Sequence, residues 1–145
     1  MNQESVVYGY IKTANDIGAS GGQASIVNRR ALMHLPTQDT CALITRDMFS
    51  TPSLVTGSDS TESTIIHFGY AYKGIEYEWQ LWMSRFEDLL QKMYWDSVIV
   101  QLETELSGTH TFSWYSGECD HTPGNTPLNI RCEWQHELGL HGRRV

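Results

Sequence analysis

This sequence of 145 residues has few features that would place it in a membrane or an oxidising compartment. No apolar run approaches the roughly 18 residues that a membrane span needs. The first residues, MNQESVVYGYIK, contain neither a basic region nor a long apolar segment, so we expect no signal peptide. Three cysteines are an odd number, which fits a full disulfide framework poorly. These absences predict a soluble, cytoplasmic protein with reduced thiols.

Basic residues are also scarce, because 10 Lys and Arg stand against 17 Asp and Glu, giving a net charge of −7. Nucleic acids are bound by basic surfaces, so this charge argues against a nucleic-acid partner. The same charge would attract a basic protein partner. The length and the hydrophobic content of 40% fit a single domain over residues 1–145, with a core of its own.

Sequence motifs that carry catalysis are missing as well. The Gly-rich stretch TANDIGASGG matches neither G-x-G-x-x-G nor a P-loop, and G-x-S-x-G is absent, so we interpret the stretch as an ordinary loop. Nothing local pairs any of the three cysteines with one of the six histidines as nucleophile and base. We therefore predict a protein that is not an enzyme and that binds no cofactor.

The strongest pattern that is present is an amphipathic helix over residues 75–93, IEYEWQLWMSRFEDLLQKM. Its large apolar residues recur at steps of three and four, as one face of a helix requires. They are Ile75, Trp79, Trp82, Met83, Phe86, Leu89, Leu90 and Met93. A face with three large aromatic rings needs a broad apolar partner, and a β-sheet provides one.

Shorter patterns before and after this helix predict a sheet and a second helix. The second helix covers residues 23–35 and stops at Pro36. Strands are predicted at residues 5–12, 40–46, 64–72, 96–105, 109–115 and 128–134. The fold class is therefore α+β, with two main helices on one face of an antiparallel sheet. The order β-α-β-β-α-β is ferredoxin-like, extended by one or two C-terminal strands. Residues 50–63 are expected to form a mobile loop, and residues 135–145 a frayed tail.

A group of cysteines and histidines late in the chain raises the question of a metal site. Cys119, His121, Cys132 and His136, with His141 beyond them, are residue types that bind zinc. Their spacing matches no common zinc motif, and Cys132 alternates in phase with apolar residues, as a buried strand residue would. We predict no bound metal. A small metal-dependent enzyme, a metal-stabilised module and a ligand-binding regulatory module remain as alternatives.

Acidic residues concentrate in the second half of the predicted sheet. Residues 61–116 contain eight acidic and three basic residues. Gln101, Glu103 and Glu105 share one face of the strand over residues 96–105, and Asp96 begins it. His110 and Trp114 belong to the neighbouring strand and could supply contact area. This row indicates either a surface for a protein partner or a solvated strand that resists aggregation.

An acidic α+β chain that opens on the strand ESVVYGYI, with no signal peptide and no catalytic motif, resembles bacterial immunity proteins. Those proteins protect bacteria against their own polymorphic or contact-delivered toxins. The resemblance covers the whole chain in general type and transfers no residue role. It implies an inhibitor that occludes the active site of a cognate toxin, with Asp96, Glu103 and Glu105 facing Arg or Lys around a basic cleft.

Overall fold

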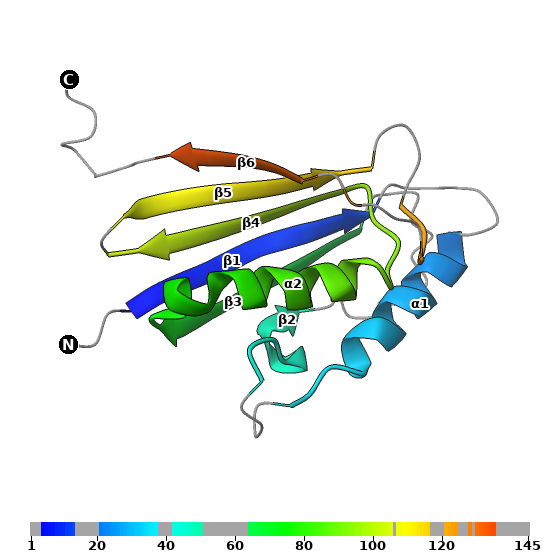
Figure 1. Cartoon of the computed structure of the whole chain (residues 1–145). Coiled ribbons are helices and arrows are strands. Elements are labelled where there is room, and N and C mark those ends of the chain that lie inside the picture. The colour runs from blue at the N-terminus through cyan, green and yellow to red at the C-terminus, as the bar shows by residue number, and fades with distance from the viewer. Residues whose placement is uncertain are drawn as a thin grey trace.

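The computed structural model describes residues 4–13, 21–37, 42–50, 64–105, 107–116, 121–124, 128 and 130–135 and shows an α+β fold (Figure 1). The predicted loop and tail fall almost entirely outside these ranges. In chain order the described elements are β1 (Glu4–Thr13), α1 (Gly21–Met33), the 3₁₀-helix η1 (Arg46–Met48), β2 (Phe49–Ser50), β3 (Thr64–Lys73), the 3₁₀-helix η2 (Ile75–Glu78), α2 (Trp79–Leu90), β4 (Ser97–Thr104), β5 (Gly108–Tyr115) and β6 (Ile130–Gln135).

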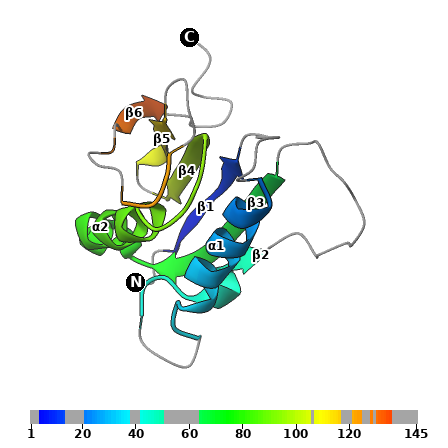
Figure 2. The ribbon, with the colours of Figure 1, turned by 90° about the vertical axis from the view of Figure 1, so that its right-hand side faces the viewer.

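The strands form one antiparallel sheet in the order β2-β3-β1-β4-β5-β6. Five of them have six to ten residues, whereas β2 has only two. The first strand of the chain lies between β3 and β4, with Val7 opposite Tyr70 on one side and Leu102 on the other. Figure 2 shows the twist of the sheet from β6 to β3. The predicted strands at residues 5–12, 64–72, 96–105, 109–115 and 128–134 are confirmed to within a few residues.

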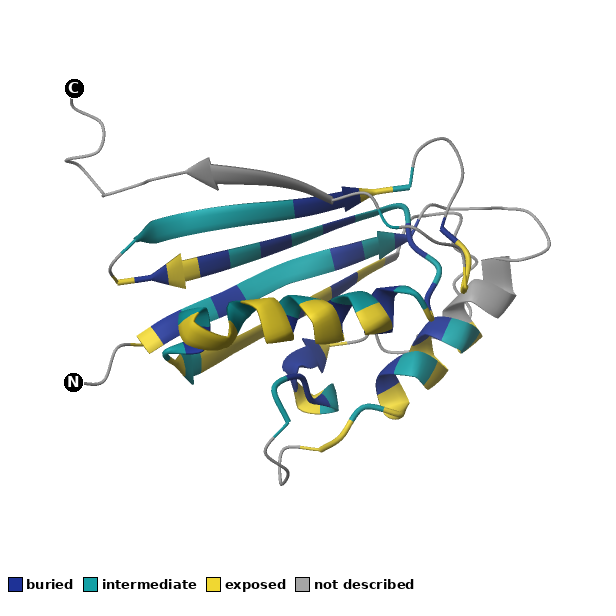
Figure 3. Cartoon of the chain, in the orientation of Figure 1, coloured by how far each residue is buried: buried dark blue, intermediate teal, exposed yellow. Residues whose placement is uncertain are grey.

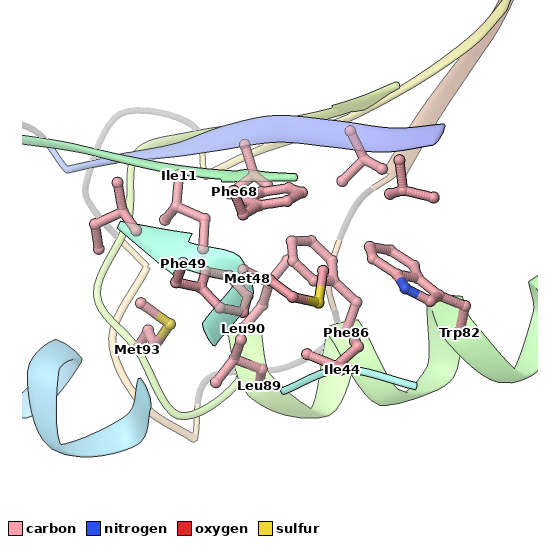
Figure 4. Packing of buried hydrophobic residues seen from close by; sticks show 14 of the residues in the cluster. Ile11, Ile44, Met48, Phe49, Phe68, Trp82, Phe86, Leu89, Leu90 and Met93 are labelled. Atoms are coloured by element: carbon pink, nitrogen blue, oxygen red, sulfur yellow. The ribbon is translucent and has the colours of Figure 1, made fainter. Parts of the chain in front are cut away.

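Helix α2 packs against one face of the sheet, and its side chains form the centre of the core (Figure 4). Trp82, Phe86, Leu89 and Leu90 are buried, as the periodicity predicts. The ring of Phe86 lies 5.3 Å from that of Phe68 in β3 and 5.5 Å from that of Trp114 in β5. The predicted helix differs at its start. Gly74 has a φ of 70°, and the first turn after it is the 3₁₀-helix η2.

Helix α1 is attached to the segment that follows α2. The side-chain amide of Asn28 donates to the carbonyl oxygen of Tyr94 at 2.9 Å and accepts from the amide N–H of Tyr94 at 2.7 Å. Asn28 and Leu32 are buried, whereas Ile26 is 58% exposed. The buried side of α1 therefore excludes Ile26. A buried Asn that satisfies two backbone groups carries no hydrophobic signal.

The strand predicted at residues 40–46 is wrong where the structure describes it. Residues 42–45 form no strand, and they lead into η1 and the two-residue β2. The apolar signal was nevertheless real, because Ile44 is buried in the core cluster. A short apolar run indicates burial without deciding between a strand and an irregular segment.

The hydroxyl of Tyr72 joins this irregular segment to β3 and α2. It donates to the carbonyl oxygen of Leu43 at 2.6 Å and accepts from the indole N–H of Trp82 at 2.9 Å. Burial raises the pKa of Tyr72 to about 12, partly offset by the hydrogen bond from Trp82.

No helix in the described part of the chain is long and apolar enough to cross a membrane.

Candidate protein-binding surface

The sheet face opposite α2 is named here the open face, and the strand register defines it. In β1 and β4, residues 7, 11, 98, 100 and 102 point toward the core and are buried, so the residues between them point away from it. Figure 3 shows this alternation as bands along β4. The open-face residues of the two strands are Val6, Tyr8, Tyr10, Lys12, Ser97, Ile99, Gln101 and Glu103. None of these eight is fully buried.

Tyr8, Gln101 and Glu103 form a cluster in the half of this face that lies toward the end of β4. Tyr8 is opposite Gln101 in the register, and its hydroxyl donates to Gln101 Oε1 at 3.3 Å. Partial burial raises the pKa of Tyr8, and the negative charge of Glu103 raises it further. The Tyr8 phenol therefore stays protonated at neutral pH and can donate a hydrogen bond.

Glu103 is exposed, and neither residue opposite it is basic. Its register partners are Val6 in β1 and Thr109 in β5. Glu105 follows in the turn after β4 and is exposed as well. A solvated carboxylate between apolar and hydroxyl neighbours can accept a charge-assisted hydrogen bond from a Lys or Arg of another molecule.

The structure thus brings together three of the six residues predicted to bind a partner, namely Gln101, Glu103 and Glu105. Asp96 lies at the other end of β4, roughly 20 Å from Glu103 at about 3.3 Å per residue. Its backbone N–H donates to the carbonyl oxygen of Lys12 at 2.7 Å. Asp96 precedes β4 and is in phase with the buried Val98, so it is not one of the open-face residues and is separate from the Glu103 cluster.

His110 and Trp114 belong to the covered face. Trp114 is opposite Val98 and has no exposed surface. Its indole N–H donates to Glu87 Oε2 at 3.0 Å, so it holds α2 against β5 and offers no contact area to a partner. His110 is opposite the buried Leu102, and its Nε2 lies 3.2 Å from Ser107 Oγ. Both residues are in phase with the core-facing side of β4.

Tyr8 and Tyr10 are the aromatic residues on the β1 side of this surface, and neither was among the predicted residues. The alternation of β1 already placed them on one face, but only the pairing of β1 with β4 brings Tyr8 beside Gln101. The register between two strands far apart in the sequence is a long-range property. Alternation within β1 therefore predicts the face that Tyr8 and Tyr10 occupy, but it does not predict which residues lie beside them.

Of the candidate metal ligands, only His121 has a described side chain. Cys119 and His136 lie outside the described residues, and for Cys132 only the backbone is described. His121 is buried, stacks on Trp95 at 4.6 Å between ring centroids, and has Nδ1 2.9 Å from the carbonyl oxygen of Met93. Within the described part of the chain, no group of three His, Cys, Asp or Glu is arranged to bind a metal ion.

A shallow pocket of about 430 Å³ lies beside the end of α2. Its lining residues are Asp88, Gln91, Lys92, Pro123 and Gly124. Asp88 and Lys92 are the charged groups among the described residues of this lining, and both are exposed.

Comparison with protein-family models, curated protein sequences and solved structures found no match for this chain.

Proposed function

We propose that this protein is an immunity-type inhibitor that binds a cognate toxin through the open face and occludes the toxin's basic active site. The proposal rests mainly on one observation, which is the exposed carboxylate of Glu103 beside Tyr8 and Gln101, with Val6 and Thr109 as its cross-strand neighbours. No basic side chain of β1 or β5 stands opposite this carboxylate. The net charge of −7 would steer the protein toward a basic cleft.

In this mechanism Glu103 and Glu105 accept hydrogen bonds from Arg or Lys side chains around the toxin's cleft, where an anionic substrate group would otherwise bind. Tyr8 and Gln101 supply further hydrogen bonds and a rigid aromatic surface. The half-buried Tyr10 and Ile99, which are opposite each other, extend the contact area along the face. Inhibition needs no catalytic group of this protein, because the toxin is blocked by occupation.

The ferredoxin-like interpretation of the fold forms part of the same proposal. The order β2-β3-β1-β4, with α1 following β1 and α2 following β3, supports it. In such a fold both helices cover one face of the sheet, which leaves the other face available for a partner. Strands β5 and β6 then extend that available face beyond β4.

The test begins with a search for a toxin gene next to the gene of this protein and then pairs the two gene products. The double variant Glu103→Lys with Glu105→Lys should lose protection against the toxin in co-expression, and its association rate should fall at least about tenfold. Added salt should slow association of the parent and affect the double variant much less. Growth and surface-based binding kinetics are the two measurements.

A matched control reverses two acidic residues elsewhere. Glu78, which precedes α2, and Asp88, which lies in α2, are both exposed. Replacing both with Lys gives the same change in net charge as the Glu103/Glu105 double variant. Glu78→Lys with Asp88→Lys should keep protection and most of the binding. Equal loss in both double variants would show that net charge alone matters and would contradict a site at Glu103. Turnover of a substrate by the purified protein, with no toxin bound, would contradict the inhibitor role.

A further inference from the structure

The ring of Tyr8 has different neighbours on its two sides. On the β4 side Tyr8 lies opposite Gln101, to which its hydroxyl donates at 3.3 Å. On the β3 side it lies opposite Gly69, which is exposed and has no side chain. A Cβ built on Gly69 would lie 3.5 Å from Tyr8 Cβ and 3.7 Å from the carbonyl oxygen of Val7, both ordinary contacts. No side chain directly opposite on β3 covers the ring, so a side chain of another molecule has room beside it.

The exposed carboxylate of Glu103 lies diagonally across from this ring. Glu103 is opposite Val6, two residues before Tyr8 on the same face of β1. Diagonal neighbours of this kind have Cα atoms roughly 7–8 Å apart, which long side chains can bridge. Partial burial raises the pKa of Tyr8, and the charge of Glu103 raises it further, so the two groups are within electrostatic reach. A flat cation above Val6 could contact both.

The basic side chains of β1 and β3 lie elsewhere on the open face, and they are Lys12, His67 and Lys73. Lys73, the nearest of them to Glu103 in the register, is two strands away and lies opposite Glu4. The residues opposite Glu103 itself, Val6 and Thr109, carry no charge. The register thus leaves Glu103 without a cationic neighbour on either adjacent strand, and a cation of a binding partner would complement it.

We infer that the toxin residue bound at this point of the open face is an arginine. Its guanidinium packs against the Tyr8 ring and donates to the Glu103 carboxylate, and its aliphatic stem crosses Gly69. This inference rests on the proposed function, because the arginine belongs to the toxin's basic active site.

The combination of a ring and a carboxylate favours arginine over lysine. A guanidinium is planar, stacks on aromatic rings and donates two parallel N–H bonds to one carboxylate. A lysine ammonium is a compact, strongly hydrated charge and makes no bidentate contact of this kind. The hydrogen bond from Tyr8 to Gln101 holds the ring in place before the partner binds, which reduces the entropy lost on binding.

The first experiment uses the protein alone and two probes, Nα-acetyl-arginine amide and Nα-acetyl-lysine amide, at constant ionic strength. Two-dimensional NMR follows the backbone amides up to about 100 mM probe, because a single side chain binds weakly. The arginine probe should shift the amides of Tyr8, Gly69 and Glu103 and should bind at least about threefold more tightly than the lysine probe. Equal binding of the two probes, or no shift at these three residues, would overturn the inference.

The second experiment repeats the titrations on variants of the ring and of the space beside it. Tyr8→Leu removes the ring and Gly69→Val fills the space, so each should abolish the preference for arginine. Tyr8→Phe keeps the ring and should keep the preference. Gly69→Val should fold, because a Cβ there makes ordinary contacts. Ser97→Val, opposite Lys12 at the far end of the open face, is the matched control and should change nothing. A preference that survives Tyr8→Leu would contradict the stacked arrangement.

Binding of the toxin separates this inference from the proposed function. Both are supported if Tyr8→Leu weakens toxin binding at least about fivefold, as Glu103→Lys with Glu105→Lys should also do. If only the double variant weakens binding, the inhibitor role holds and the arginine contact is wrong. If the arginine probe binds selectively while the protein protects against no toxin, the arginine site holds and the inhibitor role is wrong.

Discussion

The covered face and the open face of β1 and β4 differ in the substitutions that they tolerate. On the covered face, Val7, Ile11, Val98 and Val100 have no exposed surface and pack against α2. On the open face, the residues between them are half-buried or exposed, and they include charged and hydrogen-bonding side chains. Residues next to each other in the chain thus serve different purposes. Substitutions one position apart should separate stability from binding.

The largest effect is expected on the covered face, at Phe86. Its ring lies between those of Phe68, Trp82 and Trp114, at centroid distances of 5.3, 4.9 and 5.5 Å. Phe86→Ala should reduce the free energy of unfolding by about 3–5 kcal/mol, because it leaves a cavity that the neighbours cannot close. Urea unfolding measures this, with the exposed Leu81→Ala in the same helix as control, expected within about 0.5 kcal/mol. Equal losses of unfolding free energy in the two variants would contradict the assignment of Phe86, and not Leu81, to the side of α2 that faces the sheet.

Two neighbouring glycines test the comparison directly. A Cβ on Gly9 would clash with the backbone carbonyl oxygen of Ile99 and lie 3.0 Å from Phe68 Cζ. On Gly69, by contrast, it would lie 3.5 Å from Tyr8 Cβ, an ordinary contact. Gly9→Ala should therefore destabilise the protein by about 2–4 kcal/mol, and Gly69→Ala by less than about 1 kcal/mol. Thermal melts that rank the two variants in the opposite order would contradict the strand register.

Tyr72 should give an intermediate effect with a characteristic pH dependence. Tyr72→Phe leaves the carbonyl oxygen of Leu43 and the indole N–H of Trp82 without this partner, at a cost of about 1–3 kcal/mol. Because the folded state raises the pKa of Tyr72 from 10.0 to about 12, its contribution is complete below pH 10 and is lost as the pH rises toward 12. Unfolding curves from pH 8 to about pH 12 should show less alkaline loss for Tyr72→Phe than for the parent. The exposed Tyr77→Phe is the control and should behave like the parent.

The smallest effect is expected on the open face. Glu103→Lys with Glu105→Lys should change the free energy of unfolding by less than about 0.5 kcal/mol, because both side chains are exposed. The same variant is expected to lose toxin binding. A melting temperature well below that of the parent would mean that these carboxylates stabilise the fold. A loss of protection could then not be attributed to a lost binding surface.

Local periodicity accounts for the part of the fold that the sequence predicts well. Alternation along β1 separates Val7 from Tyr8, and steps of three and four identify the buried side of α2, because each pattern depends only on neighbours in the chain. The buried side of helix α1 was harder to predict, because α1 contacts Tyr94 through hydrogen bonds of the Asn28 side chain. Residues 42–45 were apolar enough to suggest a strand, but their hydrogen bond to Tyr72 comes from a distant side chain.

The candidate site shows the same division. Gln101 and Glu103 could be placed on one face from β4 alone. Trp114 was assigned to that surface because aromatic residues often bind partners, although its alternation with Phe112 matches the covered side. Only the pairing of Trp114 with Val98 decides the question. A contact between strands is set by the register, and no pattern within one strand contains it.

The central position of β1 has a consequence for how the chain is made. Strand β1 needs β3 on one edge and β4 on the other, and the latter pairing extends to Thr104. Until β4 has been synthesised, β1 cannot pair along both of its edges. Amides of β1 should therefore gain protection from hydrogen exchange together with those of β4, and not before them. The last described strands then extend the sheet in order: β5 pairs with β4, and β6 pairs with β5.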